Sequence, residues 1–316
     1  MKASTLVKSH LALFLVNALY GANHIIAKGV MPLYLSPNVF IAMRVVGATA
    51  LFWIVKLFRA KEKIARKDLI LCAVCGVFGV ANNQLFFFHG LNLSSSINAG
   101  IIMTLNPIMV AILAYFILKE PLSMLKSIGI MLGAIGAILL TLTAGTGTGD
   151  SVLGDLFLFI NALSYGIYLV LVKPLMKKYS PLTVITYVFS FGTMYVLLFP
   201  PTISDLIATD FSIIPTEVWW KIAYVIVGVT FFAYLLTVSA LKHLTASVSS
   251  SYIYFQPMMV ILFTFLFSSV GLADDYTATI TWEKVMYMLI IFSGVYITSS
   301  ASLRMRKRTK EKKLLK

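Results

Sequence analysis

The sequence predicts an all-α integral membrane protein, and three observations lead to that prediction. Of its 316 residues, 59% are hydrophobic and only 12% are charged, whereas soluble domains usually carry about 25% charged residues. The apolar residues fall into runs of about 20, which is the length that a helix needs to cross a bilayer. The connections between the runs are short and leave little chain for a soluble domain. Helices are expected because a spanning helix satisfies its own backbone hydrogen bonds.

The apolar runs predict ten transmembrane helices. Their expected ranges are Ser9–Ala27, Pro37–Leu57, Leu69–Gly90, Ser95–Leu118, Leu122–Thr143, Leu153–Val172, Pro181–Ile203, Val218–Leu241, Thr245–Val270 and Lys284–Leu303. The first run follows Lys2 and Lys8, as the core of a signal peptide would, but no small-x-small cleavage site is well placed. We therefore expect this run to remain as the first span.

Basic residues set the expected orientation. If the N-terminus is cytoplasmic, most of the 26 Lys and Arg residues lie on the cytoplasmic side, and acidic residues such as Asp155, Asp205 and Glu283 lie outside. Cytoplasmic loops of membrane proteins are enriched in Lys and Arg, so both termini are predicted to be cytoplasmic in a multi-pass protein of the cell (inner or plasma) membrane. This placement accounts for the net charge of +14 without nucleic acid, for which no recognised domain is present.

The two halves of the chain repeat one another. The tripeptide NAL at Asn17 returns at Asn161, and the pair Ser-Pro at Ser36 returns at Ser180, in both cases 144 residues later. Each half holds five spans, and because five is odd the second half enters the membrane from the opposite side. We therefore predict two inverted five-helix repeats, 9–144 and 153–303, followed by a basic cytoplasmic tail, 304–316. Such repeats are typical of secondary transporters that bind their substrate between the halves.

A proline stands near the middle of the fourth span and of the ninth span. These residues are Pro107, after Asn106, and Pro257, after Gln256, and they lie 150 residues apart. Proline removes one ladder hydrogen bond and crowds the carbonyl four residues earlier. The pair therefore predicts two hinges or gates that let each half rock. Static kinks needed only for packing are the alternative.

Four segments point to a known family: NALYGANHIIAK (17–28), Pro37 followed by Arg44, LKEPLS (118–123) and GDLFLFINALSYGIYLV (154–170). With the ten spans and the internal repeat, the chain resembles the EamA-like branch of the drug/metabolite transporter superfamily. The resemblance implies an alternating-access carrier, often a metabolite exporter, with a central cavity between its halves. One departure is that the second half has no counterpart of Glu120 and reads SSVGLADDYTATITWE (268–283) in that region.

Polar residues inside spans are candidates for substrate contact, because burying them in hydrocarbon is unfavourable. The first and sixth spans carry polar stripes with helical spacing, which we expect to face one another across the cavity: Asn17, Tyr20 and His24 in one, and Asn161, Tyr165 and Tyr168 in the other. The alternative for Asn17 and Asn161 is hydrogen bonding to neighbouring helices. Further candidates are Asn83, Asn106, Tyr234, Tyr254 and Gln256.

Arg44 is the only basic residue well inside a span. It is predicted to anchor a carboxylate or phosphate of the substrate. A structural arginine that binds helix-end carbonyls, or reaches outward to the interface, is the alternative.

Energy coupling has few candidates in the sequence. No Asp or Glu occupies the middle of a predicted span, whereas proton antiporters commonly use a buried carboxylate. This favours facilitated diffusion, exchange, or a proton site built on His24 or His89. Cys72 and Cys75 lie in apolar surroundings and are interpreted as packing residues rather than redox or zinc ligands.

The sequence therefore predicts a secondary transporter, expected to export a small organic metabolite such as an amino acid or related zwitterion. The lining of amides, hydroxyls and rings suits such solutes better than cations. No catalytic constellation, metal site or cofactor is expected, so an enzyme is not predicted. The alternative is a membrane-embedded sensor or receptor, or another non-transport membrane protein, that binds a small ligand. Besides membrane lipid and the solute no partner is expected, because the glycines at 129, 133 and 136 favour helix packing within a monomer.

Overall fold

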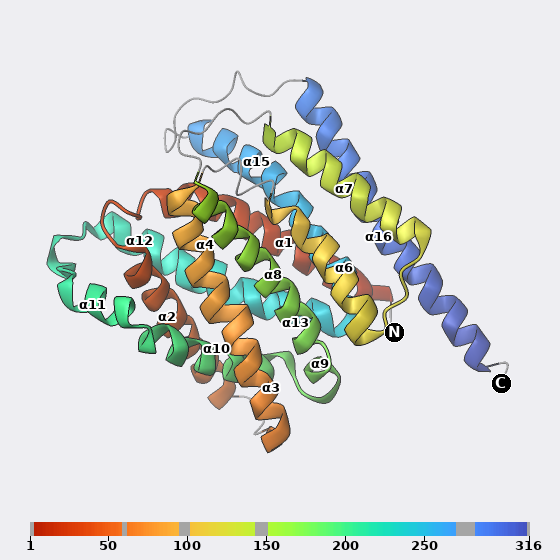
Figure 1. Cartoon of the computed structure of the whole chain (residues 1–316), viewed down its shortest axis with the longest axis horizontal. Helices are drawn as coiled ribbons and strands as arrows, with labels where there is room; N and C mark the ends of the chain where they lie inside the picture. The colour runs from red at the N-terminus through yellow and green to blue at the C-terminus, as the bar shows by residue number, and fades with distance from the viewer. Residues whose placement is uncertain (1–2, 59–61, 95–101, 143–150, 270–281, 315–316) are drawn as a thin grey trace.

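The computed structural model describes residues 3–58, 62–94, 102–142, 151–269 and 282–314, and every regular element in these ranges is helical (Figure 1). Eight of the described helices are long and apolar enough to cross a membrane, and two shorter apolar helices cover 105–118 and 124–140. The predicted class, an all-α multi-pass membrane protein, agrees with this finding. A count of ten spans and the side on which the termini lie remain predictions.

The elements follow one another along the chain with short connections. In order they are α1 (Ala3–Lys28), α2 (Pro37–Leu57), α3 (Arg66–Gly76), η1 (Val77–Ala81), α4 (Asn82–Leu93), α6 (Leu105–Leu118), α7 (Met124–Leu142), α8 (Val152–Val172), α9 (Leu175–Lys178), α10 (Pro181–Leu198), α11 (Pro200–Ala208), η2 (Phe211–Ile213), α12 (Thr216–Tyr224), η3 (Val225–Phe232), α13 (Ala233–His243), α14 (Ala246–Ser251), η4 (Tyr252–Phe255), α15 (Gln256–Ser269) and α16 (Trp282–Leu314).

Two helices begin in the same way, as the repeated Ser-Pro pair predicts. The hydroxyl of Ser36 accepts the backbone N–H of Val39 at the start of α2, and the hydroxyl of Ser180 accepts that of Thr183 at the start of α10. Proline follows each serine at the first helical position, where its missing N–H is not needed. These local signals fix both helix starts.

The seventh predicted span ends earlier than expected. The sequence predicted a helix through Ile203, but α10 ends at Leu198 and a separate helix, α11, begins at Pro200. Phe199 adopts an extended conformation (φ −71°, ψ 116°), because a residue that precedes proline avoids the helical region. The prediction of one helix through Ile203 was therefore wrong.

Both spans with a central proline are interrupted one turn before it. Thr104 is a turn residue between helical Met103 and the start of α6. In the second half, the 3₁₀ segment η4 separates α14 from α15, which contains Pro257. Proline prevents the regular hydrogen bond to the carbonyl four residues before it, so the interruptions lie where the prolines require them. The predicted gating role of these prolines is not tested by this geometry.

Helices α2 and α10 pack against one another as an antiparallel pair, since Trp53 toward the end of α2 contacts Tyr187 in the first half of α10. Near its centre, the hydroxyls of Thr49 and Thr193 are 2.7 Å apart, and these residues are 144 positions apart in sequence. That separation equals the repeat shift read from the sequence. Each threonine therefore contacts its own counterpart in the other half, as residues on a two-fold axis do.

A carboxylate holds the start of each helix in this pair. At the start of α2, Asp205 accepts hydrogen bonds from Ser36 Oγ (2.7 Å) and Asn38 Nδ2 (2.9 Å). At the start of α10, Glu62 accepts them from the backbone N of Ser180 (3.0 Å) and from its Oγ (2.9 Å). Asp205 follows α10 and Glu62 follows α2, so the two carboxylates lie at opposite ends of the pair. We call these contacts the paired carboxylate caps.

Acidification is expected to weaken the paired carboxylate caps. Hydrogen bonds from Ser36 and Asn38 lower the pKa of Asp205. Burial raises the pKa of Glu62, but hydrogen bonds from Thr183 and Ser180 outweigh it, so the net shift is downward. A carboxyl whose pKa is lowered on folding stabilises the fold above its unfolded pKa of about 4, and this contribution is lost as the pH falls through the native pKa.

The measurement is the apparent Tm of purified protein in detergent between pH 7 and pH 3. The double variant Asp205→Asn, Glu62→Gln should lose less thermal stability than the wild type between pH 5 and pH 3. Parallel curves for the two proteins would contradict this role of the carboxylates.

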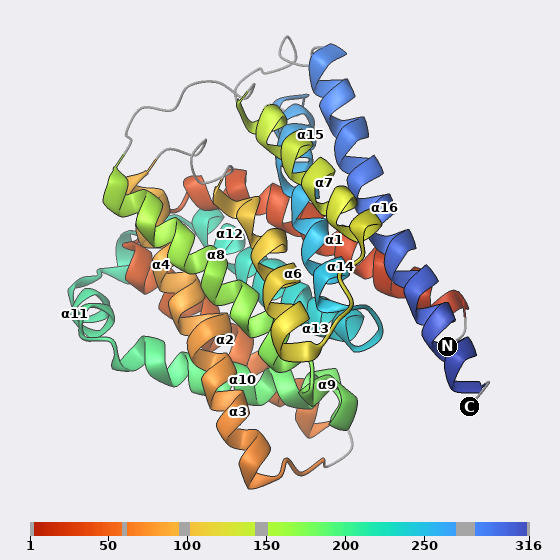
Figure 2. The same ribbon diagram turned by 45° about the vertical axis from the view of Figure 1, so that its right-hand side comes forward.

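The last helix of each half packs against the other, and glycines make the approach possible. Helices α7 and α16 lie side by side (Figure 2). A Cβ atom on Gly294 of α16 would lie 2.4 Å from the backbone N of Gly133, and one on Gly129 of α7 would lie 2.8 Å from the carbonyl O of Gly294. The predicted small-residue face is thus used for packing within this chain.

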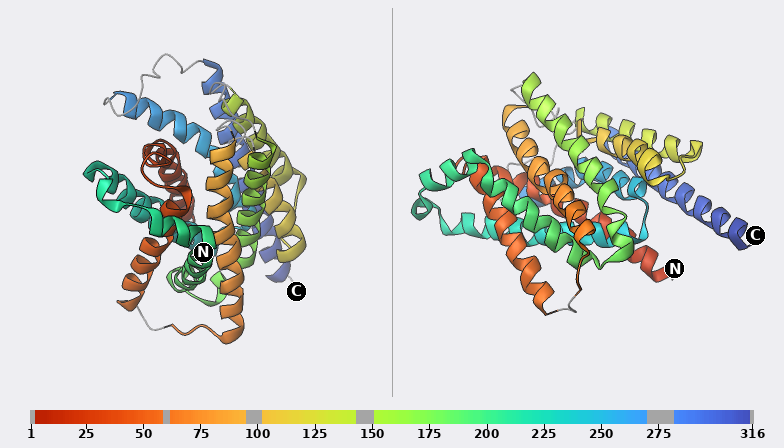
Figure 3. Two further views of the ribbon diagram at one scale, coloured as in Figure 1. Left: turned by 60° about the vertical axis from the view of Figure 1, so that its left-hand side comes forward. Right: turned by 60° about the horizontal axis from the view of Figure 1, so that its bottom comes forward.

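Both chain termini lie at the same end of the molecule, which we call the terminal face (Figure 2). Helix α16 continues through the predicted basic tail to Leu314 and extends beyond its neighbours at this face (Figure 3). The end of α2, the start of α3 and the connections between α6 and α7 and between α8 and α10 also lie there (Figure 1). The other end is called the opposite face.

Candidate functional site

A cavity of about 110 Å³ lies between the halves of the chain. Spans from both halves contribute to it, namely α1, α2, α4, α6, α8, η3, α13, η4 and α15, whereas α7, α10 and α16 contribute none of its described residues. The lining is Tyr20, Asn23, Arg44, Asn83, Gln84, Phe87, Phe88, Met103, Asn106, Asn161, Ala162, Tyr165, Val229, Tyr234, Ile253 and Gln256. It combines amides, phenols and one cation with apolar walls, a typical composition for a small-molecule site.

Arg44 is the cation of the cavity, and only 4% of it is exposed. Its Nε donates to Thr230 Oγ1 at 3.2 Å. The guanidinium carbon lies 5.0 Å from the ring centre of Phe88 and 5.5 Å from that of Phe40. Within the described residues no carboxylate forms an ion pair with it. A buried cation is stable only with a partner of opposite charge or strong hydrogen bonds, so this group is suited to receive an anion.

Three asparagines connect the halves at the cavity. Asn161 Nδ2 donates to the carbonyl O of Asn83 at 2.6 Å, and Asn106 Nδ2 donates to the carbonyl O of Ala162 at 2.6 Å. Because only the NH₂ group of a side-chain amide can donate, these two bonds fix the orientation of the Asn161 and Asn106 amides. The Oδ1 atom of Asn106 is buried and has no donor among the described residues, and the same is true of Asn23 Oδ1.

Tyr234 is the centre of a hydrogen-bond network beside the cavity. Its hydroxyl lies 3.1 Å from Asn83 Oδ1 and 3.2 Å from the carbonyl O of Gly79, and it accepts a bond from Gln84 Nε2 at 3.1 Å. The ring packs edge-on against Phe189. The network thus joins α13 of the second half to η1 and α4 of the first.

Two π-helical segments supply acceptors to the region of the cavity. In η1, the carbonyls of Phe78 and Gly79 accept hydrogen bonds from Ser164 Oγ and Tyr234. In η3, the carbonyl of Val225 accepts from Thr230 Oγ1, the same hydroxyl that binds Arg44. The wider turn of a π-helix leaves carbonyls available to side chains, and such segments are frequent at functional sites.

Replacing Tyr234 with phenylalanine should remove the centre of this network. The substitution leaves the Gly79 carbonyl and two amide groups without a hydroxyl partner, which is expected to cost about 1–3 kcal/mol. We expect a lower apparent Tm and several-fold weaker substrate affinity. Tyr224→Phe is the matched control, because the hydroxyl of Tyr224 makes a single bond among the described residues, to the carbonyl O of Leu19 at 3.1 Å. Equal behaviour of the two variants would contradict the role of Tyr234.

The structure brings eight of the predicted site residues together around the cavity and places others elsewhere. The eight are Tyr20, Arg44, Asn83, Asn106, Asn161, Tyr165, Tyr234 and Gln256. Tyr20 of α1 and the α8 residues Asn161 and Tyr165 thus share one cavity.

Asn17, Tyr168 and Tyr254, which the sequence also predicted as site residues, are not part of the cavity lining. Asn17 Nδ2 donates to the carbonyl O of Leu13 in its own helix at 2.7 Å. The rings of Tyr168 and Tyr254 fill the space left by Gly79 and Gly133, respectively, where a Cβ would lie 2.4 Å from the ring. Because these glycines on neighbouring helices leave room for a ring, the two tyrosines pack against them and do not line the cavity. The side chain of His24 lies outside the described residues.

Several lining residues were not among the predicted ones. Asn23 is the third residue after Tyr20, a spacing that fits the polar stripe as well as His24 does. Gln84 belongs to a run of three amides, of which the sequence predicts only Asn83 as a site residue. Apolar residues such as Met103 and Val229 carry no signal that separates cavity lining from lipid contact. His89, a candidate proton site, binds Asn38 Oδ1 at 2.9 Å near the opposite face and not in the cavity.

The described part of the chain, with its eight long apolar helices and its buried polar cavity, has the architecture of a multi-pass membrane protein. Among the described residues no group of three or more His, Cys, Asp and Glu could hold a metal ion. The chain belongs to the EamA-like transporter family, whose sequence model matches residues 7–142 and again residues 152–300. The family resemblance inferred from the motifs is thereby confirmed.

Similar proteins agree with this assignment. The uncharacterized transporter YyaM of Bacillus subtilis (strain 168) is 30% identical over 285 residues, which cover 88% of this chain and 89% of YyaM. YetK, another uncharacterized transporter of that organism, is 24% identical over a region that covers 80% of this chain and 78% of YetK. An uncharacterized transporter of Archaeoglobus fulgidus is 25% identical over 84% of this chain and 89% of that protein. A solved crystal structure with 18% identity superposes with a TM-score of 0.71, covers 96% of this chain and 99% of its own, and shows the fold alone.

Proposed function

We propose that this protein is a secondary transporter of the cell membrane that exports a small zwitterionic metabolite, such as an amino acid, by alternating access around the cavity. In this proposal ten spans form two inverted five-helix repeats, both termini face the cytoplasm, and the monomer is the working unit in the lipid bilayer. The proposal is supported above all by one observation. Arg44 is buried at the cavity and pairs with none of the described carboxylates.

The buried cation Arg44 supports the proposal that the substrate carries a carboxylate. A guanidinium presents several donors in a planar fork that matches a carboxylate. Its Nε is already bound to Thr230, which orients the rest of the group. A bound carboxylate would supply the negative charge that the described residues lack at this position.

Two amide oxygens at the cavity support the proposal that the same solute also carries an ammonium group. Asn23 Oδ1 and Asn106 Oδ1 are acceptors that have no described donor, and both residues line the cavity with Arg44. An ammonium group carries three N–H donors and no acceptor, so it complements such oxygens. Neutral acceptors also explain how the site could hold a cationic group without a buried carboxylate.

The volume supports a compact solute. At about 110 Å³ the cavity is somewhat smaller than the engineered cavity of about 150 Å³ that holds benzene. Amino acids with small side chains fall within this range. Larger substrates would need the halves to separate further.

The test is solute uptake and counterflow in proteoliposomes, with a mixture of isotopically labelled amino acids and with matched lone carboxylates and lone amines. Each assay is run with and without a proton gradient, which separates proton coupling from exchange or facilitated diffusion. We expect accelerated flux of one or more zwitterions. Binding of a solute without any flux would instead indicate the sensor or receptor that the sequence left as the alternative.

A further inference from the structure

The connection between α6 and α7 holds the start of α14, which belongs to the other half of the chain. Glu120 Oε1 accepts the backbone N–H of Ala246 at 2.9 Å, and its Oε2 accepts the hydroxyl of Ser247 at 3.1 Å. A carboxylate at a helix start satisfies free N–H groups and interacts favourably with the helix dipole. Helix α14 also packs against α6 and α8. The terminal face is therefore closed at this point by a contact between the two halves.

The backbone of the first half directs Glu120 toward this contact. Lys119, just before it, has φ 54° and ψ 34°, a left-handed conformation that is unfavourable for a residue with a side chain by about 1–2 kcal/mol. The turn ends α6 and lets the N–H of Glu120 bond to the carbonyl O of Ala114 at 3.0 Å. The left-handed turn at Lys119 thus ends α6 and places the side chain of Glu120 against the start of α14.

Lys126 on α7 is the charge partner of Glu120. Its Nζ lies 3.5 Å from Glu120 Oε2, and the side chains of Lys126 and Glu120 are 2% and 11% exposed. Both residues belong to the first half, so they would move together if the halves separated. The carboxylate would then leave α14 without becoming an unpaired buried charge, which is the expensive outcome. The contact can therefore open reversibly.

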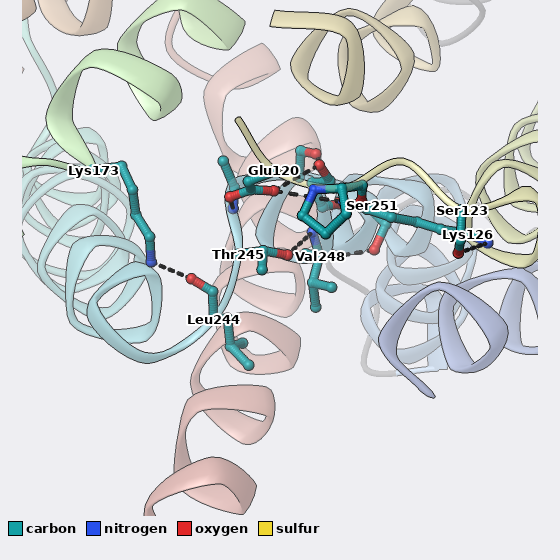
Figure 4. A network of polar contacts seen from close by, with 12 residues as sticks. Glu120, Ser123, Lys126, Lys173, Leu244, Thr245, Val248 and Ser251 are labelled. Carbon is teal, nitrogen blue, oxygen red and sulfur yellow. Dashed lines mark hydrogen bonds and ion pairs between the residues drawn. The ribbon is translucent and has the colours of Figure 1, made fainter. Parts of the chain in front are cut away.

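A second cation, Lys173, binds the segment between α13 and α14, which belongs to the same half of the chain as Lys173. Lys173 donates to the carbonyl oxygens of Leu241 and Leu244 at the end of α13. Thr245 then caps α14 by accepting the N–H of Val248 at 3.3 Å. Figure 4 shows Lys173 and Glu120 approaching the segment at Leu244 and Thr245 from different directions. Of these two charges, only Glu120 crosses from one half to the other.

The Glu120 contact differs from the paired carboxylate caps in its symmetry. The caps at Asp205 and Glu62 occur at both faces, so each has a counterpart under the repeat. By contrast, the position 150 residues after Glu120 is Val270, a residue with no carboxylate. In a carrier built from inverted repeats, the two halves exchange conformations as the site changes sides. A contact found at both faces can persist through this exchange, whereas a contact that joins the halves at one face must break. Within the described residues the Glu120 contact occurs at the terminal face alone.

We propose that the Glu120–α14 contact is the lock of the cytoplasmic gate, and that the paired carboxylate caps hold α2 and α10 together as a fixed axis. The inference rests on the proposed function, with the terminal face in the cytoplasm. The lock is closed in the state described here and opens when the cavity faces the cytoplasm. Lys126 accompanies Glu120 through the transition, and Lys173 keeps α13 joined to α14.

The experiment measures distances across the gate by double electron–electron resonance in lipid nanodiscs. Spin labels are placed on cysteines at Leu122 and Lys242, which are exposed on the two halves, in a background with Cys72→Ala and Cys75→Ala. Glu120→Gln should increase the ratio of the long-distance to the short-distance population about tenfold or more, because a charge-assisted hydrogen bond is lost. Ser247→Ala should shift it in the same direction but less, and it preserves the pairing of Glu120 with Lys126.

Glu62→Gln is the matched control, because it neutralises a carboxylate that also holds a helix start in the other half. It should lower the apparent Tm without changing the distance distribution at the gate. The proposal is overturned if neither Glu120→Gln nor Ser247→Ala changes the distribution in folded protein, or if Glu62→Gln changes it as much. The readout requires no substrate, so a failure to transport any tested solute would refute the proposed function and leave this measurement intact.

Discussion

Replacing Arg44 with glutamine is expected to raise the KM for a zwitterionic substrate by about 10- to 100-fold, with little loss of thermal stability. The buried guanidinium forms no ion pair with a described carboxylate, so removing it takes away no ion pair that supports the fold. A hydrogen bond to a charged group contributes about 1.5–3 kcal/mol, which corresponds to this range of affinity. The measurements are concentration-dependent uptake in proteoliposomes and the apparent Tm of the same preparation.

Arg44→Lys separates charge from geometry. Lysine keeps the positive charge but lacks the planar fork, so its KM should lie between those of the wild type and Arg44→Gln. If Arg44→Gln fails to fold while Arg44→Lys transports normally, the arginine is structural. Unchanged uptake by folded Arg44→Gln would remove the main support for an anionic group on the substrate.

The largest effect on stability is expected at Gly294. Even Gly294→Ala would place a Cβ atom 2.4 Å from the backbone N of Gly133 and 2.7 Å from the carbonyl O of Gly129. These neighbours are backbone atoms, so relief requires α7 and α16 to separate. Overpacking typically costs about 1–3 kcal/mol, occasionally more, and we expect this site to reach at least the upper value. Gly294→Val should abolish the monodisperse folded protein.

Gly228→Ala provides the matched control for Gly294→Ala. The nearest atom to a Cβ at Gly228 is Tyr224 Cε2 at 3.4 Å, an ordinary van der Waals contact. Size-exclusion profiles and apparent Tm values of the two variants should therefore differ widely. Similar values would mean that α7 and α16 tolerate separation, and that their close contact does not stabilise the protein.

The fold class and several helix starts were predictable because they depend on local chemistry. Hydrophobic runs of spanning length indicate membrane helices, and the Ser-Pro pairs at Ser36 and Ser180 specify two N-termini. The end of α10 was missed because Pro200 lies inside an apolar run that hydropathy alone reads as continuous. The π segments η1 and η3 were not predictable, since a wider helical turn has no distinctive residue signature.

The candidate site was predictable only in part because cavity lining depends on neighbouring helices. Tyr165 and Tyr168 share a predicted helix face, yet Tyr165 lines the cavity whereas Tyr168 packs against Gly79. The sequence of α8 cannot show that a glycine on another helix leaves room for a ring. Arg44 was identifiable because an arginine in the middle of an apolar span is rare whatever surrounds it.

The hydrogen bond between Thr49 and Thr193 gives distance measurements an internal standard. Residues that pair with their own counterparts stay equidistant from both halves when these exchange shapes. A pair of probes placed at 49 and 193 should therefore report one unchanging separation through a complete transport cycle, while probe pairs at the two membrane surfaces lengthen and shorten in opposite phase. Any drift at this central pair would mean that the halves slide along one another instead of rotating about a common line.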